Sequence, residues 1–238
     1  MRIVTAKQIQ QQLRILASPA VARSSARFFK TAPGEYGAGD LFIGVRIPPL
    51  RTLAREHRSL AFSEIEVLLQ SPIHEERMLA LLILTLTVTN AAQGKTVYDF
   101  YVRNIANVNN WDLVDGSAPA IVGGYLLDRS RQPLEDWARS ANLWERRIAM
   151  IATLHFIRRD DFKDTLKIAL VLRDDPEDLI HKASGWMLRE VGKRHLSTLN
   201  AFLQAHGTTL PRTALRYAIE RHPPATRKAI LRGDFSLT

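Results

Sequence analysis

Apolar residues recur along this chain at the three- and four-residue spacing of an amphipathic α-helix, and this period constrains the fold more than any other feature. Leu13, Leu16 and Ala17 give one example. Pro and Gly residues interrupt the pattern at short intervals, which is typical of helices that end and restart. No stretch of the sequence shows sustained strand alternation between hairpin turns, and we interpret residues 42–47 as a loop or the approach to a helix. We therefore predict an all-α fold.

Several helical segments resemble one another, because each begins with charged residues and continues with apolar ones. They start at His74, Leu143, Leu179 and Pro211. The second and third lie 36 residues apart, and a period in the mid-thirties is typical of an α-solenoid, whose repeats bury each other's apolar faces. We predict a single domain over residues 1–238, built as a curved solenoid. An irregular helical bundle is the alternative.

The chain carries a large surplus of positive charge. Its 33 Lys and Arg residues exceed its 24 Asp and Glu residues, which gives a formal net charge of +9. A surplus of this size favours a polyanionic partner, with nucleic acid ahead of a membrane surface. Basic residues concentrate in the later half, and between Pro211 and Arg232 the only acidic residue is Glu220. We expect them to line a concave groove that matches the phosphate charge of duplex DNA.

Other sequence features exclude whole classes of function. The chain has no Cys, so disulfides, thiolate zinc sites and cysteine nucleophiles are excluded. The longest apolar stretch, residues 78–88, is shorter than the roughly 20 residues that span a membrane, and the N-terminus lacks the pattern of a signal peptide. The His residues are scattered, and His74, His155 and His181 suit a helix surface or packing. We expect a cytoplasmic monomer, associated with the nucleoid through DNA, with neither metal nor cofactor.

The most distinctive motif is NNWDLVD, which begins at Asn109. Asn110 is suited to cap a helix that starts at Trp111, and this would place Trp111 and Asp115 one turn apart on one helix face. An aromatic face beside a carboxylate suits a developing cation. The alternative is a core Trp beside an Asp that balances the helix dipole, for which Asp112 is the better candidate.

Two further segments carry residues of chemical interest. LWERR places Arg146 and Arg147 in the first turn of a predicted helix, where a guanidinium can bind a carboxylate or a phosphate. A solvated arginine pair is the alternative. In GWMLRE, Trp186 follows Gly185, and glycine permits close approach of backbone or ligand. A Trp packed in the core is again the alternative.

With these three segments, the chain resembles the AlkD family of DNA alkylation-repair glycosylases, which are built from HEAT-like helical repeats. The resemblance covers most of the chain, from about Ala26 to Ala214. It is most specific in WDLVD from Trp111, in NLWERR from Asn142 and in KASGWMLRE from Lys182. The resemblance implies a solenoid of HEAT-like repeats that binds double-stranded DNA.

The resemblance also implies roles for individual residues. The family's catalytic carboxylate falls on Asp115, and the two tryptophans that embrace the sugar of the damaged nucleotide fall on Trp111 and Trp186. The arginine that holds the DNA backbone near the lesion falls on Arg147 and not on Arg146.

One position departs from the family: a tyrosine that packs beside the lesion's backbone is Phe28 here, which keeps the aromatic ring and loses the hydroxyl. Further DNA contacts are expected from basic residues near these motifs. These residues are Arg146, Arg158, Lys182 and Arg189.

The implied activity is that of a monofunctional DNA glycosylase of base excision repair. It would hydrolyse the N-glycosidic bond of cationic N3- or N7-alkylated purines in duplex DNA, without flipping the base and without a cofactor. Two alternatives stay open: a non-catalytic helical-repeat protein that binds nucleic acid, and a protein-interaction scaffold.

Overall fold

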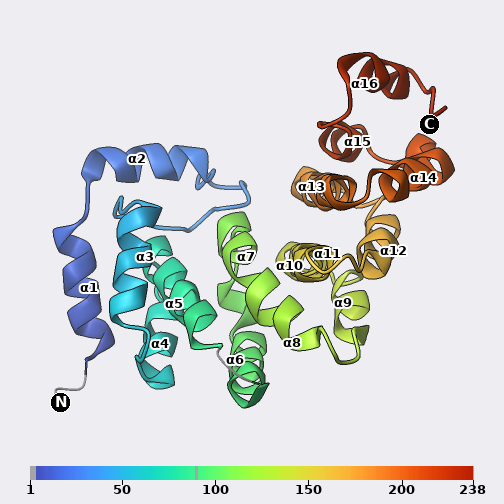
Figure 1. The fold of residues 1–238 in the computed structure, drawn as a ribbon. Helices are drawn as coiled ribbons and strands as arrows, with labels where there is room; N and C mark the ends of the chain where they lie inside the picture. Colours follow the sequence, from blue (N-terminus) through green and yellow to red (C-terminus); the bar gives the residue numbers. More distant parts are fainter. Residues whose placement is uncertain (1–3, 89–90, 238) are drawn as a thin grey trace. The chain divides into compact units, whose positions relative to one another are not determined.

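The computed structural model describes residues 4–88 and 91–237, and within these residues the regular structure is helical (Figure 1). The one β-type feature in the described ranges is an isolated bridge between Leu41 and Ile73. The predicted all-α fold is thus confirmed. The chain divides into two compact units, Met1–Ser117 and Ala118–Thr238, and the prediction of a single domain stays a prediction.

The first unit consists of seven α-helices and one 3₁₀ turn. They are α1 (Ala6–Ile15), α2 (Pro19–Phe28), α3 (Ile47–Glu56), α4 (Phe62–Leu69), α5 (His74–Thr87), α6 (Ala91–Arg103), η1 (Ile105–Asn107) and α7 (Trp111–Ala118). Helices α3 and α4 pack against α5, whose residues from Met78 to Leu84 are nearly all buried. The predicted buried helix is therefore α5. Helix α2 lies crosswise to α1 and α3 (Figure 1) and buries none of its residues.

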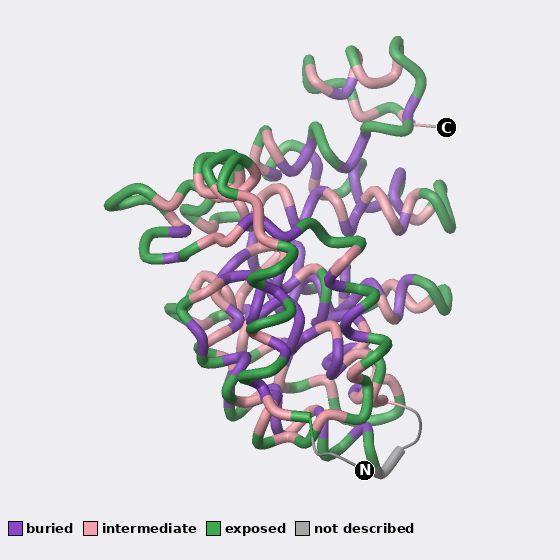
Figure 2. The backbone as a smooth tube through the Cα atoms, turned by 90° about the vertical axis from the view of Figure 1, so that its left-hand side faces the viewer, coloured by how far each residue is buried: buried purple, intermediate pink, exposed green. Residues whose placement is uncertain are grey.

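The second unit is centred on the longest helix, α13. Its elements are η2 (Pro119–Gly123), α8 (Gly124–Leu126), α9 (Gln132–Trp137), α10 (Leu143–Ala152), α11 (Leu154–Ile157), α12 (Lys163–Val171), α13 (Asp178–Arg194), α14 (Leu196–His206), η3 (Gly207–Thr209), α15 (Arg212–Ala218) and α16 (Pro224–Leu231). Helices α10, α14 and α15 all pack against α13. In both units, buried and exposed residues alternate along the same helices (Figure 2), as amphipathic patterning requires.

The predicted period of about 35 residues is present in the helix boundaries. Helices α5, α7, α10, α13 and α15 begin 37, 32, 35 and 34 residues apart. A contact also recurs within the second unit: Gly123 lies against the carbonyl of Ala152, and Gly185 lies against the carbonyl of Ala214, 29 residues later in both cases. At both places a Cβ on the glycine would overlap the neighbouring backbone. The same helix-pair geometry is therefore used twice.

The segment between α2 and α3 is a loop that leads into α3, as predicted for residues 42–47. It is held by the buried carboxylate of Glu75, which accepts hydrogen bonds from the backbone N–H groups of Ile43, Gly44 and Val45 at 3.1, 2.7 and 3.2 Å. Gly44 has a φ of +84° and lies against the backbone of α2, so a side chain at this position would be both strained and obstructed. In the described residues, no helix is long and apolar enough to cross a bilayer.

Candidate functional site

Helix α7 carries the motif that the sequence singled out. It begins at Trp111, as predicted, and the backbone N–H of Trp111 donates to Oδ1 of Asn110 at 2.8 Å. Trp111 and Asp115 are both half-buried and lie one turn apart, so their side chains share a face of the helix. An indole and a carboxylate are thus presented together at the start of a helix.

The ring of Trp111 belongs to a cluster of aromatic side chains. Phe29 stacks on it, with centroids 5.1 Å apart and an interplanar angle of 15°. Phe28 meets it edge-on at 5.8 Å, although the residue is 66% exposed. The stack continues from Phe29 to Phe42 at 5.0 Å, and from Phe42 to His74 at 4.5 Å. The structure thus brings the predicted residues Trp111 and Phe28 together.

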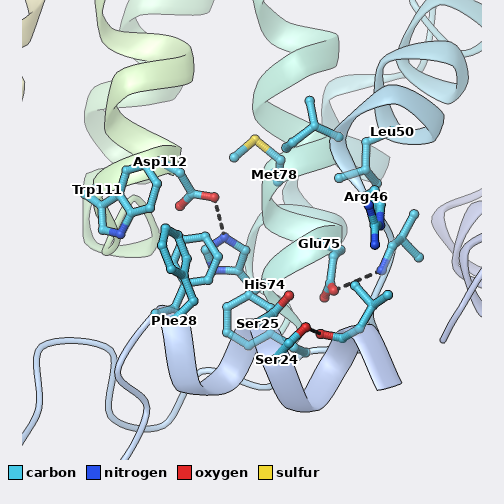
Figure 3. Close-up of a pocket in the computed structure, with 15 residues that line it drawn as sticks. Ser24, Ser25, Phe28, Arg46, Leu50, His74, Glu75, Met78, Trp111 and Asp112 are labelled. Atoms are coloured by element: carbon cyan, nitrogen blue, oxygen red, sulfur yellow. Dashed lines mark hydrogen bonds and ion pairs between the residues drawn. The ribbon is translucent and has the colours of Figure 1, made fainter. Parts of the chain in front are cut away.

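A cavity of about 530 Å³ lies beside this cluster, between α2, α3, α5 and α7 (Figure 3). Ser24, Ser25 and Phe28 of α2 form one wall, and Trp111 and Asp112 of α7 form another. Leu50 and Met78 make its interior largely apolar. Figure 3 shows Phe28 and Trp111 on the side of the cavity where His74 is hydrogen-bonded to Asp112.

His74 is buried between two carboxylates. Its Nδ1 lies 3.1 Å from Oδ2 of Asp40, and its Nε2 lies 2.9 Å from Oδ2 of Asp112. Asp40 also accepts from Nη2 of Arg77 at 2.5 Å and from Nδ2 of Asn110 at 2.8 Å. A connected polar network therefore lies beneath the start of α7.

The network determines the charge of its members. Burial acts against the charged form of His74, but the hydrogen bonds to Asp112 and Asp40 outweigh burial and raise the pKa of His74 above its ordinary value. Burial likewise acts against the carboxylate of Asp40, but His74, Arg77 and Asn110 together lower the pKa of Asp40. Both shifts favour an imidazolium between two carboxylates.

A second buried contact supports the last turn of α7. The hydroxyl of Ser117 donates to the carbonyl of Leu113 at 2.6 Å, and the hydroxyls of Tyr101 and Ser117 lie 3.2 Å apart. Burial and the negative charge of Asp115 raise the pKa of the Tyr101 phenol. Helix α7 is therefore held at its first turn by α5 and at its last turn by α6.

In the second unit, Trp186, Arg189 and Arg158 line one cavity of about 450 Å³. The indole Nε1–H of Trp186 donates to Oε1 of Glu190 at 3.1 Å, which orients the ring. Lys193 and Arg194 complete the basic side of the cavity. Three of the predicted residues thus share a site, and its charge suits an anionic ligand.

The two adjacent arginines of α10 have different surroundings. Arg146 binds Oδ2 of Asp175 through Nε at 2.6 Å and donates to the carbonyls of Ser140 and Ala141. Arg147 is buried, with 4% of its surface exposed, and its Nη1 donates to the carbonyl of Leu179 at 2.6 Å. Arg146 therefore has a structural role in the second unit, whatever it contributes to a ligand.

The other predicted cations also differ in their partners. Lys182 pairs with Asp178 at 2.8 Å, and Arg189 pairs with Glu220 and lies 3.6 Å from Glu190. The side chain of Arg158 is exposed and forms no hydrogen bond or ion pair with any of the residues that the structure describes. It is therefore the predicted DNA contact whose charge is most available.

The predicted residues fall into two groups. Phe28, Trp111 and Asp115 belong to the first unit, and Arg147 and Trp186 belong to the second. Over residues 4–88 and 91–237, no three His, Asp or Glu side chains converge as candidate metal ligands.

Sequence reasoning missed the network around His74. We expected this residue on a helix surface or in packing; it packs on Phe42, but it also joins Asp40 to Asp112. The partners are 34 and 38 residues away in the sequence, so no local pattern could have identified them.

Comparisons with known proteins agree with this architecture. The model of a family described as DNA alkylation repair enzyme matches residues 9–222. A predicted DNA alkylation repair enzyme from Enterococcus faecalis superposes with a TM-score of 0.70 at 18% identity, covering 87% of this chain and 97% of that one. No curated protein matches the sequence.

Two structures from Streptococcus mutans share the fold as well. AlkD2 gives a TM-score of 0.56 at 15% identity, with 91% of this chain and 99% of that chain covered. The protein smu.31 from strain UA159 gives 0.52 at 16% identity, with 91% and 96% covered. At such identities the likeness is one of fold.

Proposed function

Because the chain belongs to the DNA alkylation repair enzyme family, we propose that it is a monofunctional DNA glycosylase of base excision repair. It hydrolyses the N-glycosidic bond of cationic N3- or N7-alkylated purines in duplex DNA. The observation that carries this proposal is the pairing of Trp111 with Asp115 one turn apart on α7. The DNA partner also accounts for the formal charge of +9.

The chemistry requires little acid catalysis. A purine alkylated at N3 or N7 carries a positive charge, so the bond to the sugar breaks with its electron pair moving to the base, which leaves neutral. The sugar becomes an oxocarbenium-like cation, as in glycoside hydrolysis. Water adds to C1′ and releases a proton, and the products are a free base and an abasic site. The barrier therefore lies in the cationic sugar.

Asp115 and Trp111 meet this requirement on the same helix face. The carboxylate of Asp115 stabilises the cation and accepts or directs the proton of the attacking water. The face of Trp111 adds a cation–π contact and excludes solvent. The stack with Phe29, at 5.1 Å, fixes the ring before substrate arrives, so it does not have to be ordered during the reaction.

The second unit supplies contacts to the DNA backbone in this proposal. Trp186 gives the second aromatic face toward the sugar, and its hydrogen bond to Glu190 limits its rotation. Arg147 holds the backbone near the lesion. Arg158, Lys182 and Arg189 add positive charge along the duplex, which makes binding dependent on salt. Arg146 is bonded to Asp175 and supports the fold of this unit.

We further propose that the lesion stays stacked in the duplex. Enzymes that flip a base bind it in a pocket of their own, whereas Asp115 and Trp111 have to reach only the sugar. Selection then depends on how readily the base leaves, which favours charged lesions.

The test is release of methylated purine from a methylated duplex, measured by chromatography under single-turnover conditions. We expect release by the wild type and a loss of about 10²–10³-fold in rate for Asp115→Asn, the usual effect of removing one preorganised electrostatic group. DNA binding should be retained. Salt-sensitive binding without any release would identify a non-catalytic DNA-binding protein, and rapid release by Asp115→Asn would remove this residue from the role.

A further inference from the structure

We propose that His74 is a positioning residue for Trp111 and Asp115; this role rests on the proposed glycosylase function. His74 lies on α5, and the two reacting side chains lie on α7. It acts on them through the residues on either side of Trp111, which are Asn110 and Asp112.

The connections form a closed set of hydrogen bonds. Nε2 of His74 contacts Asp112 at 2.9 Å, and Nδ1 contacts Asp40 at 3.1 Å. Asp40 binds Nδ2 of Asn110 at 2.8 Å, and Oδ1 of the same Asn110 accepts the backbone N–H of Trp111 at 2.8 Å. The first turn of α7 is therefore fixed to α5 at two points, and Asp115 lies one turn further along the same helix.

The geometry requires the charged form of His74. Each ring nitrogen faces a carboxylate, and only the imidazolium can donate from both. Arg77 supplies the second positive charge through its bond to Asp40, so two cations balance the carboxylates of Asp40 and Asp112. Loss of the proton from His74 would leave a buried excess of negative charge, and one of the two carboxylates would face a ring nitrogen that has no hydrogen to donate.

The charged groups that face His74 come from three elements. On α5 itself these are Arg77 and the neighbouring Glu75, whose carboxylate is directed to the backbone N–H groups of residues 43–45. The loop before α3 contributes Asp40, and α7 contributes Asp112. Phe29, directly after α2, and Phe42 of the same loop add uncharged aromatic rings. The charge on His74 therefore depends chiefly on the two aspartates.

A second route leads from His74 to Trp111 through ring contacts. The imidazole stacks on Phe42 at 4.5 Å, Phe42 stacks on Phe29 at 5.0 Å, and Phe29 stacks on Trp111 at 5.1 Å. A change at His74 thus reaches Trp111 both along the backbone of α7 and across the aromatic stack.

The pH profile of single-turnover excision, measured for the wild type and for His74→Gln, tests this role. The wild-type rate should fall as the pH rises through the pKa of His74, because the imidazolium is lost. His74→Gln should lack this alkaline limb and should be about tenfold to a hundredfold slower at neutral pH, the size of effect that a small misplacement causes. The concentration for half-maximal DNA binding should be unchanged.

The matched control is His222→Gln. His222 is also buried and hydrogen-bonded, to Oδ1 of Asn200 at 2.9 Å, but it belongs to the second unit. Its loss should leave the shape of the pH profile intact. An alkaline limb that persists in His74→Gln would overturn the proposal, as would its loss in His222→Gln.

An NMR titration separates this inference from the proposed function. The indole N–H resonance of Trp111, assigned with Trp111→Phe, should shift with the titration of His74 in the wild type and stop shifting in His74→Gln. If it does so in a protein that releases no base, the coupling stands and the glycosylase function fails. If excision occurs but the Trp111 resonance does not shift with the titration of His74, the positioning role fails and the function stands.

Discussion

Phe29 and Trp111 stack with their ring centroids 5.1 Å apart and their planes 15° from parallel. Phe29 directly follows α2 and Trp111 begins α7, so one aromatic contact joins two helices that are far apart in the sequence. The position of the Trp111 ring is thereby set by a residue outside its own helix.

Replacing Phe29 by Leu should lower the free energy of unfolding by at least the value of one aromatic pair, about 0.5–1.5 kcal/mol. It should also slow excision, because Trp111 loses the ring that orients it. Urea unfolding and single-turnover release measure the two effects. Phe28→Leu is the matched control. Phe28 is mostly exposed, so this substitution should change the free energy of unfolding of the protein little. Equal destabilisation by both variants would contradict a specific role of the Phe29–Trp111 stack in stability.

Arg158→Ala should weaken DNA binding uniformly across sequences and reduce the salt slope of log K by about one. The reason is that the guanidinium of Arg158 is exposed and has no ion-pair or hydrogen-bond partner in the described part of the chain. Binding titrations at several salt concentrations provide the measurement. An unchanged slope would place Arg158 away from the phosphates.

Arg146→Ala should act instead on stability. Its removal leaves Asp175, whose side chain is 3% exposed, as a buried carboxylate without its cation, and breaking such a pair costs about 3–5 kcal/mol. Thermal unfolding should reveal this loss. A variant that unfolds like the wild type but binds DNA poorly would show that Arg146 is a DNA contact first.

Gly185→Ala should destabilise the second unit, because the added Cβ would overlap the carbonyl of Ala214 and Cβ of Tyr217. Overpacking of this kind costs about 1–3 kcal/mol. Gly94→Ala provides the contrast, since its Cβ would meet nothing nearer than 3.9 Å and Ala is favoured over Gly within a helix by about 1 kcal/mol. Urea midpoints should therefore move in opposite directions.

The pH dependence of stability should distinguish two buried histidines. The pKa of His74 is raised, so its contribution is complete below its ordinary pKa of 6.5 and is lost as the pH rises through the folded value. The pKa of His222 is lowered by burial, so its contribution is complete above 6.5 and is lost as the pH falls. Urea unfolding at a series of pH values should show that His74→Gln removes an alkaline decline and His222→Gln an acidic one.

Local patterns in the sequence were sufficient to predict much of the helical structure of this protein. The start of α7 was predictable because Asn110 bonds the adjacent N–H of Trp111, and such capping depends on neighbouring residues alone. The spacing between helix starts could be predicted for the same reason, because the apolar residues of each amphipathic helix mark its buried face.

Long-range polar contacts could not be read in this way. His74 and Asp40 are separated by 34 residues, and their pairing follows from how the loop after α2 packs on α5. The same holds for the basic residues. The sequence does not distinguish Arg146 from Arg158, but in the folded chain Arg146 is paired with the buried carboxylate of Asp175. The net charge can be counted from a sequence, but the ion-pair partner of each charged residue cannot be read from it.

Helix α2 buries none of its residues, yet Ser24, Ser25 and Phe28 form a wall of the cavity beside Trp111. Substitutions on this wall should therefore cost the fold little while they change the shape of the cavity beside Trp111. A library of α2 variants can therefore vary the surroundings of Trp111 without sacrificing the scaffold.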